Sequence, residues 1–272
     1  MTINCNGKLI SLETPKIMGI LNLTPDSFYD GGSYKNEREI LQQTEKMLTD
    51  GAFCIDVGAY SSRPNAEDVS TEKEMQRLMP VIELLQKEFP DIILSIDTFR
   101  SEIAKKAIDN GAAIINDISG GSLDELMMKT VGELKVPYIL MHMRGTPKTM
   151  QSLTQYDDLL QDIIYYFSNK VAEARSFGIH DIILDPGFGF AKTTSQNFEL
   201  LKNLSLLNVL EIPVLAGLSR KSMIYKTLEI SAKEALNGTS VLNTLALQQG
   251  AKLLRVHDVK EAKECIDLVA QL

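Results

Sequence analysis

The sequence predicts one (β/α)8 barrel that spans residues 1–272 and carries a short N-terminal β-hairpin. Three observations favour this fold class. The chain has 272 residues, and a barrel of this kind takes about 250. Eight short apolar runs alternate with stretches of helical apolar spacing. No low-complexity stretch, charge block or Pro/Ser-rich linker divides the chain, which favours a single domain.

The apolar runs are the predicted strands. Each is short and lacks strict alternation, as expected of parallel strands that are buried on both faces. Before them, Asn6-Gly7 is typical of a hairpin turn between two short strands. The eight runs are Ile17–Leu21, Phe53–Val57, Ile92–Ile96, Ala113–Ile115, Tyr138–Met141, Ile182–Leu184, Val214–Leu218 and Lys252–Val256.

Helical apolar spacing separates the runs. We expect Ser101 to be the N-cap of a helix over Glu102–Asn110, with Gly111 just after its end. Three more helices are marked by Val81, Ile82, Leu84 and Leu85 before Pro90, by Leu200, Leu201, Leu204 and Leu207, and by Ala235, Val241, Leu242 and Leu245 before Gly250. Strand and helix therefore alternate, which is the α/β pattern.

An open doubly wound sheet is the alternative arrangement of these elements. A Rossmann fold needs a Gly-rich turn after its first strand, and Asn22-Leu23-Thr24-Pro25 stands there instead. The later fragment Gly187-Phe188-Gly189 lacks the third glycine of that motif. Eight strand–helix units favour the closed barrel.

Composition limits the compartment and the partners. The net charge of −8 disfavours nucleic acid or a membrane surface as a broad partner. No apolar stretch reaches the roughly 18 residues of a membrane span, and the start lacks the pattern of a secretory signal. Three scattered cysteines indicate a reducing compartment.

Polar residues follow every predicted strand, and in an α/β barrel the chemistry gathers at those C-terminal ends. Asp97, Asn116 and Asp185 form a set of hydrogen-bond acceptors, although Asn116 can donate as well. Such a set suits a ligand edge rich in N–H groups, such as an aminopyrimidine or a guanidine.

A second set supplies donors and positive charge. Its members are Ser62, Arg63, Lys221, Arg255 and His257. Arginine and lysine beside hydroxyl groups are the usual means of holding phosphate or pyrophosphate. Asn22 offers a carbonyl oxygen, which suits a hard cation such as Mg²⁺ that is bound mainly through substrate phosphates and water.

Seven motifs stand at the strand ends. In chain order they are Asn22-Leu23-Thr24-Pro25-Asp26-Ser27-Phe28, Ser61-Ser62-Arg63-Pro64, Asp97-Thr98, Asn116-Asp117, Asp185-Pro186-Gly187-Phe188-Gly189-Phe190, Gly217-Leu218-Ser219-Arg220-Lys221-Ser222 and Arg255-Val256-His257-Asp258. Together these motifs resemble those of the dihydropteroate synthase family of pterin-binding enzymes. The likeness extends from Ile17 to Asp258, so it covers nearly the whole chain. Two residues depart from the family pattern: Ser62 stands where threonine is usual, and Asn65 where glycine is usual.

The resemblance implies a cytoplasmic, homodimeric transferase of folate synthesis that uses Mg²⁺ and is a target of sulfonamides. It implies that 6-hydroxymethyl-7,8-dihydropterin pyrophosphate and 4-aminobenzoate are joined to 7,8-dihydropteroate, with release of pyrophosphate. The implied catalytic residues are Asp97, Lys221 and Arg255. The implied ligand contacts are Asp97, Asn116, Asp185, Lys221 and Arg255 for the pterin, Asn22, Ser62, Arg63, Arg255 and His257 for pyrophosphate and metal, and Ser62, Pro64, Phe190, Ser219 and Lys221 for aminobenzoate.

The predicted site places hydrogen-bond acceptors opposite cationic groups and has no evident nucleophile–base pair. This arrangement predicts a dissociative reaction, in which the leaving group departs before the nucleophile attacks. An aniline nitrogen is a weak nucleophile, so the reaction gains most if pyrophosphate leaves before the nitrogen attacks. Asp97, and less directly Asp185, would then stabilise the resulting pterin methylene cation in a water-poor site.

Several roles stay open at this point. Asp56 either supports the site or only orients Arg63 or a helix end, and His142 makes either a structural hydrogen bond or a ligand contact. Arg220 is expected to point outward, because neighbouring residues on a strand face opposite ways. Other possible functions are a methyltetrahydrofolate-dependent methyltransferase, an aldolase that uses Lys221 as its nucleophile, and a pterin-binding paralogue without activity.

Overall fold

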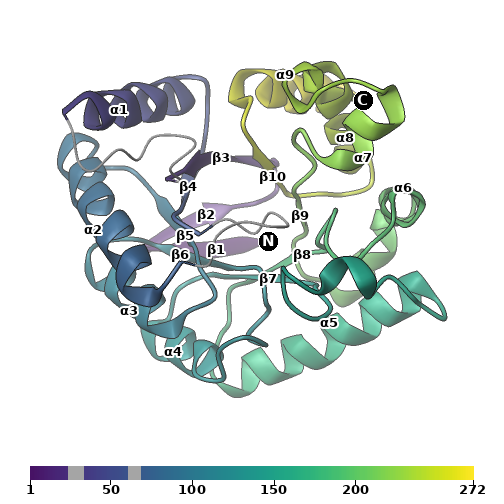
Figure 1. Ribbon diagram of the computed structural model, residues 1–272, viewed down its shortest axis with the longest axis horizontal. Coiled ribbons are helices and arrows are strands. Elements are labelled where there is room, and N and C mark those ends of the chain that lie inside the picture. The colour runs from purple at the N-terminus through teal and green to yellow at the C-terminus, as the bar shows by residue number, and fades with distance from the viewer. Residues whose placement is uncertain (24–33, 61–68) are drawn as a thin grey trace.

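The computed structural model describes residues 1–23, 34–60 and 69–272. Eight parallel strands stand in the order β8-β7-β6-β5-β4-β3-β10-β9, with helices around them (Figure 1). A parallel bridge between Leu184 and Val214 joins the two ends of this order, so the sheet is a nearly closed barrel. The strands are β3 (Lys16–Asn22), β4 (Cys54–Gly58), β5 (Leu94–Asp97), β6 (Ile114–Asp117), β7 (Tyr138–Met141), β8 (Ile182–Asp185), β9 (Leu215–Ala216) and β10 (Leu253–Val256).

The predicted (β/α)8 fold is confirmed, and the predicted strand ends agree with the structure to within two residues. Their apolar runs are buried on both faces, as the absence of alternation predicted. The surrounding helices are α1 (Tyr34–Thr49), α2 (Thr71–Glu88), α3 (Ser101–Asp109), α4 (Met127–Leu134), α5 (Leu159–Ser176), α6 (Thr194–Lys202), α7 (Ser222–Leu228), α8 (Leu236–Gln248) and α9 (Val259–Val269), with short 3₁₀ turns η1 (Met150–Ser152), η2 (Leu204–Leu210) and η3 (Ala232–Glu234).

The N-terminal hairpin closes one end of the barrel. Its strands are β1 (Thr2–Cys5) and β2 (Lys8–Ser11), and both turn residues, Asn6 and Gly7, have positive φ. Side chains of the hairpin pack on the inward-facing residues of the strands in one apolar cluster. The Asn4 N–H donates to Asp181, which precedes β8, so the hairpin covers the N-terminal ends of the strands. The opposite, C-terminal rim is left for a ligand.

Two local predictions were wrong. Ser101 is the first residue of α3 rather than its N-cap: its N–H donates to the Asp124 carboxylate (2.7 Å), and Arg100 holds the N-cap position without a side-chain cap. The leucine repeat after residue 200 does not continue one helix, because Asn203 bonds back to the Glu199 carbonyl (2.8 Å) and ends α6. The predicted helix marked by Val241, Leu242 and Leu245 is present as α8, although Val241 and Leu245 are exposed on it.

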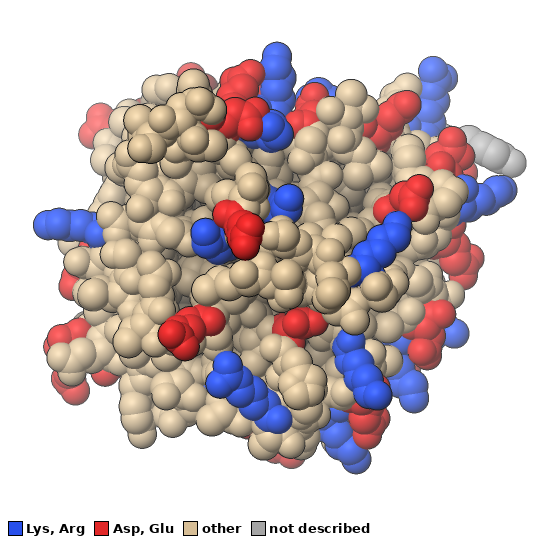
Figure 2. Space-filling model, turned by 180° about the vertical axis from the view of Figure 1, so that it is seen from behind, with Lys and Arg blue, Asp and Glu red and all other residues tan. Residues whose placement is uncertain are grey.

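Charged side chains are interspersed over the face that Figure 2 shows, and neither sign forms a large patch there. The three cysteines are all buried and free. Within the part of the chain that the structure describes, none of the helices combines the length and the apolar character that crossing a membrane requires.

Candidate active site

A cavity of about 640 Å³ opens at the C-terminal ends of the strands. Seven of the predicted site residues line it: Asn22, Asp97, Phe190, Ser219, Lys221, Arg255 and His257. They come from five different strands or the segments after them. The topology thus brings together residues that lie far apart along the chain, as the barrel prediction required.

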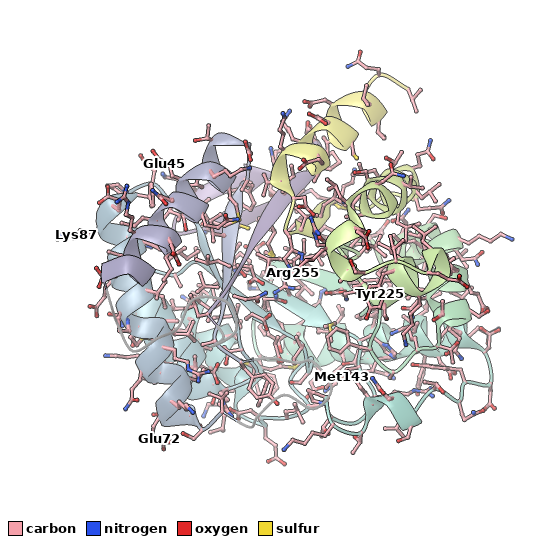
Figure 3. All side chains as sticks on the ribbon, turned by 45° about the horizontal axis from the view of Figure 1, so that its top comes forward. Glu45, Glu72, Lys87, Met143, Tyr225 and Arg255 are labelled. Atoms are coloured by element: carbon pink, nitrogen blue, oxygen red, sulfur yellow. The ribbon has the colours of Figure 1, made fainter. Side chains whose placement is uncertain are left out.

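Arg255 links two carboxylates at the centre of this rim. Its Nε donates to Asp56 (2.6 Å) and its Nη2 donates to Asp97 (2.8 Å). Asp56 is fully buried, whereas Asp97 keeps about a fifth of its side chain exposed toward the cavity (21%). Figure 3 shows Arg255 in the middle of the molecule, with Tyr225 of α7 beside it.

Asp56, which is buried behind the cavity lining, connects residues of the site through hydrogen bonds. Its Oδ1 accepts from the Ser95 hydroxyl (2.6 Å), and its Oδ2 accepts from Asn116 Nδ2 (3.0 Å) as well as from Arg255. Because the Asn116 amide donates to Asp56, its carbonyl oxygen is the group left for a ligand N–H. Of the two roles left open for Asp56, the structure shows support of the site.

Asn116 and Asp185 lie deeper than the cavity wall. Asn116 is 3% exposed and Asp185 is 5% exposed, and neither lines the cavity. Asp185 accepts from the Gly187 N–H (2.8 Å), and burial raises its pKa while Lys221 opposes the rise. The two predicted pterin acceptors therefore form the floor of the site.

Lys221 lies between the acceptor Asp185 and an aromatic wall of the cavity formed by Phe188 and Phe190. Its ammonium donates to the Phe188 carbonyl and lies 4.9 Å from the centroid of the Phe190 ring. Burial lowers the pKa of Lys221 to about 8, and Asp185 opposes this shift. Burial therefore brings the pKa of this amine toward neutral pH, and the Asp185 carboxylate favours its charged form.

The ends of β9 and β10 are joined by two contacts. Ser219 Oγ lies 2.9 Å from His257 Nδ1 and accepts from the His257 N–H (3.2 Å). Arg220 binds Asp258 through two bonds of 2.8 Å and donates to the carbonyls of Ala232 and Lys233. Arg220 thus borders the cavity from a turn after β9, and its guanidinium is engaged by Asp258 and two carbonyls, whereas the sequence predicted a strand residue that points outward.

Burial also changes the protonation of the central pair. It raises the pKa of Asp97 to about 7, although the guanidinium of Arg255 opposes this shift. The pKa of Arg255 is raised by the two carboxylates that it binds, so its charge is permanent. The site holds one fixed cation and one carboxylate that titrates near neutral pH.

Comparison with known proteins places this geometry in a family. Residues 18–257 match the family described as pterin binding enzyme. The chain belongs to the pterin binding enzyme family. It is 41% identical to dihydropteroate synthase of Escherichia coli K12 over 272 residues, which covers 99% of this chain and 95% of that protein. Dihydropteroate synthase of Synechocystis is 46% identical over 247 residues, which covers 90% of this chain and 85% of that protein.

Solved structures of the family agree with the fold. The Yersinia pestis dihydropteroate synthase with a sulfonamide drug complex superposes with a TM-score of 0.93 at 40% identity, and the match covers 100% of this chain and 98% of that one. A Xanthomonas albilineans dihydropteroate synthase with 4-aminobenzoic acid superposes with a TM-score of 0.91 at 36% identity and covers 99% and 97%. The predicted resemblance is confirmed.

The cavity is also lined by residues to which the sequence assigned no role. Ser222 and Tyr225 line it from α7, Tyr60 lines it just after β4, and Met150 lines it from η1. Ser222 belongs to the Ser-Arg-Lys-Ser string and Tyr225 follows one helical turn later, so helical spacing could have found both. No motif marks Met150.

Some predicted residues cannot be placed. Ser62, Arg63 and Pro64 lie outside the described residues, as do the departure at Asn65 and most of the first motif after Leu23. Their roles stay predictions.

Asn22 ends β3 at the rim of the cavity, where its amide oxygen could bind a cation. Among the described residues no three His, Cys, Asp or Glu side chains cluster as metal ligands do. The donor set fits a hard cation that takes most of its ligands from substrate oxygens and water.

Proposed function

We propose that the protein is a dihydropteroate synthase. It joins 6-hydroxymethyl-7,8-dihydropterin pyrophosphate to 4-aminobenzoate and releases 7,8-dihydropteroate and pyrophosphate in folate synthesis. The observation that carries this proposal is one cavity in which hydrogen-bond acceptors around Asp97 lie beside the donors Lys221, Arg255 and His257. The identity of 41–46% to dihydropteroate synthases over most of the chain supports it.

The pterin edge binds the acceptors in this proposal. Asp97 accepts from pterin N–H groups, and the carbonyl of Asn116 and the carboxylate of Asp185 accept from others deeper in the floor. Lys221 and Arg255 complete the pterin contacts, with Arg255 stacking on the ring plane while Asp56 keeps hold of its Nε. The fixed Asp56 contact holds Arg255 in place before the ligand arrives, which lowers the cost of ordering it.

The pyrophosphate lies on the cationic side. His257 and Arg255 bind its oxygens together with Asn22. The family resemblance adds Ser62 and Arg63, which lie outside the described residues. Asn22 would hold Mg²⁺, which would supply positive charge toward the pyrophosphate oxygens. Ser219 holds His257 through their 2.9 Å contact, so the ring faces the anion in a defined orientation.

The chemical step needs charge stabilisation more than a strong base. As pyrophosphate departs, positive charge develops on the pterin methylene group, and the carboxylate of Asp97 stabilises it in a site that excludes water. The aminobenzoate ring lies against Phe190, with Ser219 and Lys221 around it, and its nitrogen attacks the methylene carbon. The family resemblance adds Ser62 and Pro64, which lie outside the described residues. The nitrogen then loses a proton as the C–N bond forms.

Three further proposals concern the state of the protein. Residues 1–272 act as one domain, and the protein works in the cytoplasm as a homodimer. Exposed apolar side chains on neighbouring helices support the dimer (Figure 1): Leu228 on α7, Val241 and Leu245 on α8, and Leu268 on α9. Light scattering of the purified protein tests it, and a monomer at micromolar concentration would contradict it.

One assay tests the function. The purified full-length chain is incubated with MgCl₂, the pterin pyrophosphate and 4-aminobenzoate, and pyrophosphate release is followed. We expect release that needs both substrates and stops when EDTA removes the metal. Pterin binding by calorimetry without any release would instead indicate the non-catalytic paralogue. The clustering of Lys221, Arg255 and His257 gives the methyltransferase alternative no support, because that reaction has no anionic leaving group of this kind.

A further inference from the structure

Lys192 carries a buried ammonium group that the proposed reaction does not use. The residue lies between β8 and α6 and is 8% exposed. Its Nζ lies 3.0 Å from His142 Nδ1, 3.1 Å from the Gly187 carbonyl oxygen and 3.1 Å from the Phe190 carbonyl oxygen. Burial lowers the pKa of Lys192 to about 7. Burying an amine is costly, so three well-placed acceptors at one nitrogen indicate a specific structural purpose.

The acceptors show that the ammonium lies inside a folded-back segment. Gly187, Gly189 and Ala191 all have positive φ, so the chain between them reverses repeatedly. At Gly187 a side chain is excluded, because a Cβ atom would lie 2.2 Å from the carbonyl oxygen of His142. The carbonyls of Gly187 and Phe190 consequently converge on Lys192, which joins the two halves of the segment.

His142 fixes the ammonium to the barrel. The residue follows β7, is 1% exposed, and packs edge-on against the Tyr166 ring with centroids 4.8 Å apart. Burial, together with Lys192 and Arg144, lowers the pKa of His142, so the ring is neutral and its Nδ1 can accept from Lys192. Its N–H donates to the Asp185 carbonyl (2.8 Å). Of the two roles left open for His142, the structure shows the structural hydrogen bond.

The segment that Lys192 holds forms one wall of the cavity. Phe188, Gly189 and Phe190 line it, whereas Lys192 does not. The Phe188 carbonyl accepts from Lys221, and the Phe190 ring lies under the same ammonium at 4.9 Å. A shift of this segment would therefore move both the aromatic wall and the lysine that faces it.

We propose that Lys192, held by His142, is a positioning residue that sets the geometry of the Phe188–Phe190 wall and so the binding of 4-aminobenzoate, without touching a substrate. The identity of the substrate in this inference rests on the proposed function, whereas the positioning of the wall by Lys192 does not. In the proposed function the wall residues contact the aminobenzoate end. Of the pterin contacts, Asn116 and Arg255 bind Asp56 directly and Asp97 is held through Arg255, whereas Asp185 and Lys221 touch the wall segment. Loss of the ammonium should therefore affect one substrate more than the other.

The first experiment is kinetic. Lys192→Met keeps the length of the side chain and removes the charge, and Lys202→Met, at an exposed lysine on α6, is the matched control. We expect Lys192→Met to raise the KM for 4-aminobenzoate by about tenfold or more, while the KM for the pterin pyrophosphate changes less than about threefold. Equal KM changes for the two substrates, or no change, would overturn the proposal.

A second pair of variants removes the acceptor instead of the amine. His142→Asn places an amide oxygen close to the position of Nδ1, and His142→Leu removes the acceptor. We expect His142→Asn to stay within about threefold of the parent in the KM for 4-aminobenzoate, and His142→Leu to match Lys192→Met. This pair keeps the idea testable if Lys192→Met does not fold. Identical behaviour of the two His142 variants would count against the proposal.

Hydrogen exchange gives a readout that needs no activity. The Gly189 N–H donates to Asn197 Oδ1 (2.7 Å) and the Phe190 N–H donates to the Gly187 carbonyl (3.0 Å). In Lys192→Met both amides should exchange about tenfold faster, with exchange in β3 to β6 unchanged. If exchange is faster in Lys192→Met but the parent protein releases no pyrophosphate, the structural role stands and the proposed function is rejected. Unchanged exchange in Lys192→Met would reject the structural role.

Discussion

Nη2 of Arg255 lies 2.8 Å from Oδ2 of Asp97, although 158 positions separate the two residues in the chain. The same guanidinium binds Asp56 through its Nε, so Arg255 is held from below whatever happens to the Asp97 contact. Asp97 is the partner that faces the cavity. A ligand with N–H groups can therefore take up the Asp97 carboxylate while Arg255 stays in place.

The first prediction concerns Asp97. Asp97→Asn should keep the fold, because the amide is similar in size and can still accept from Arg255. It should lower kcat by about two to three orders of magnitude, since a neutral group cannot stabilise the developing pterin cation. Steady-state pyrophosphate release measures this, and circular dichroism checks the fold. A turnover number near that of the parent would remove Asp97 from this role.

The second prediction concerns Asp56. Asp56→Ala leaves Arg255, Asn116 and Ser95 without a buried acceptor, so the free energy of unfolding should fall by about 3–5 kcal/mol. Urea denaturation measures it. The control is Ser95→Ala, which removes a single hydrogen bond and should cost about 1 kcal/mol. If both variants cost the same, Asp56 is not the centre of this network.

The third prediction is a bell-shaped pH profile of kcat/KM for the pterin pyrophosphate. Asp97, with its pKa raised to about 7 by burial, must be ionised, so the rate should fall as the pH drops below 7. Lys221, with its pKa lowered to about 8, must be charged, so the rate should fall as the pH rises above 8. Arg255 faces Asp97 and Asp185 faces Lys221, and of these neighbours Arg255 stays charged across this range.

Two variants assign the limbs of that profile. The residual activity of Asp97→Asn should lack the acidic limb, and that of Lys221→Met should lack the basic limb. A profile that is flat between pH 6 and 9 in the parent protein, followed by pyrophosphate release, would contradict both assignments.

The fourth prediction concerns Arg220, whose guanidinium joins the turn after β9 to Asp258. Arg220→Lys keeps the charge but cannot make the two parallel bonds to the carboxylate, so stability should fall by about 2 kcal/mol. The KM for the pterin pyrophosphate should rise several-fold, because the neighbouring Ser219–His257 contact loses its support. Asp258→Asn is the matched variant from the other side, and parent-like kinetics in both would show that the pair has no influence on His257.

Much of the barrel could be predicted because parallel strands buried on both faces must be apolar at every position, which leaves short continuous runs such as Tyr138–Met141. The failures were local. Ser101 has a good capping side chain, but Asp124, 23 positions away, accepts from the Ser101 N–H, and Ser101 is the first residue of α3 instead of its cap. Val241 and Leu245 have the right helical spacing for a core face, yet they are exposed on α8. Apolar spacing marks a helix face but does not say what that face meets.

The sequence by itself determined the fold class and the residue types at the strand ends. The local choice of residues sets which segments are buried and how strands and helices alternate along the chain. The tertiary structure alone decided how those residues pair. Asp56 gathers Ser95, Asn116 and Arg255, the last from 199 positions away, and Lys192 meets His142 across 50. Such contacts depend on which side chains meet when the barrel closes, and local periodicity carries no information about these long-range pairs.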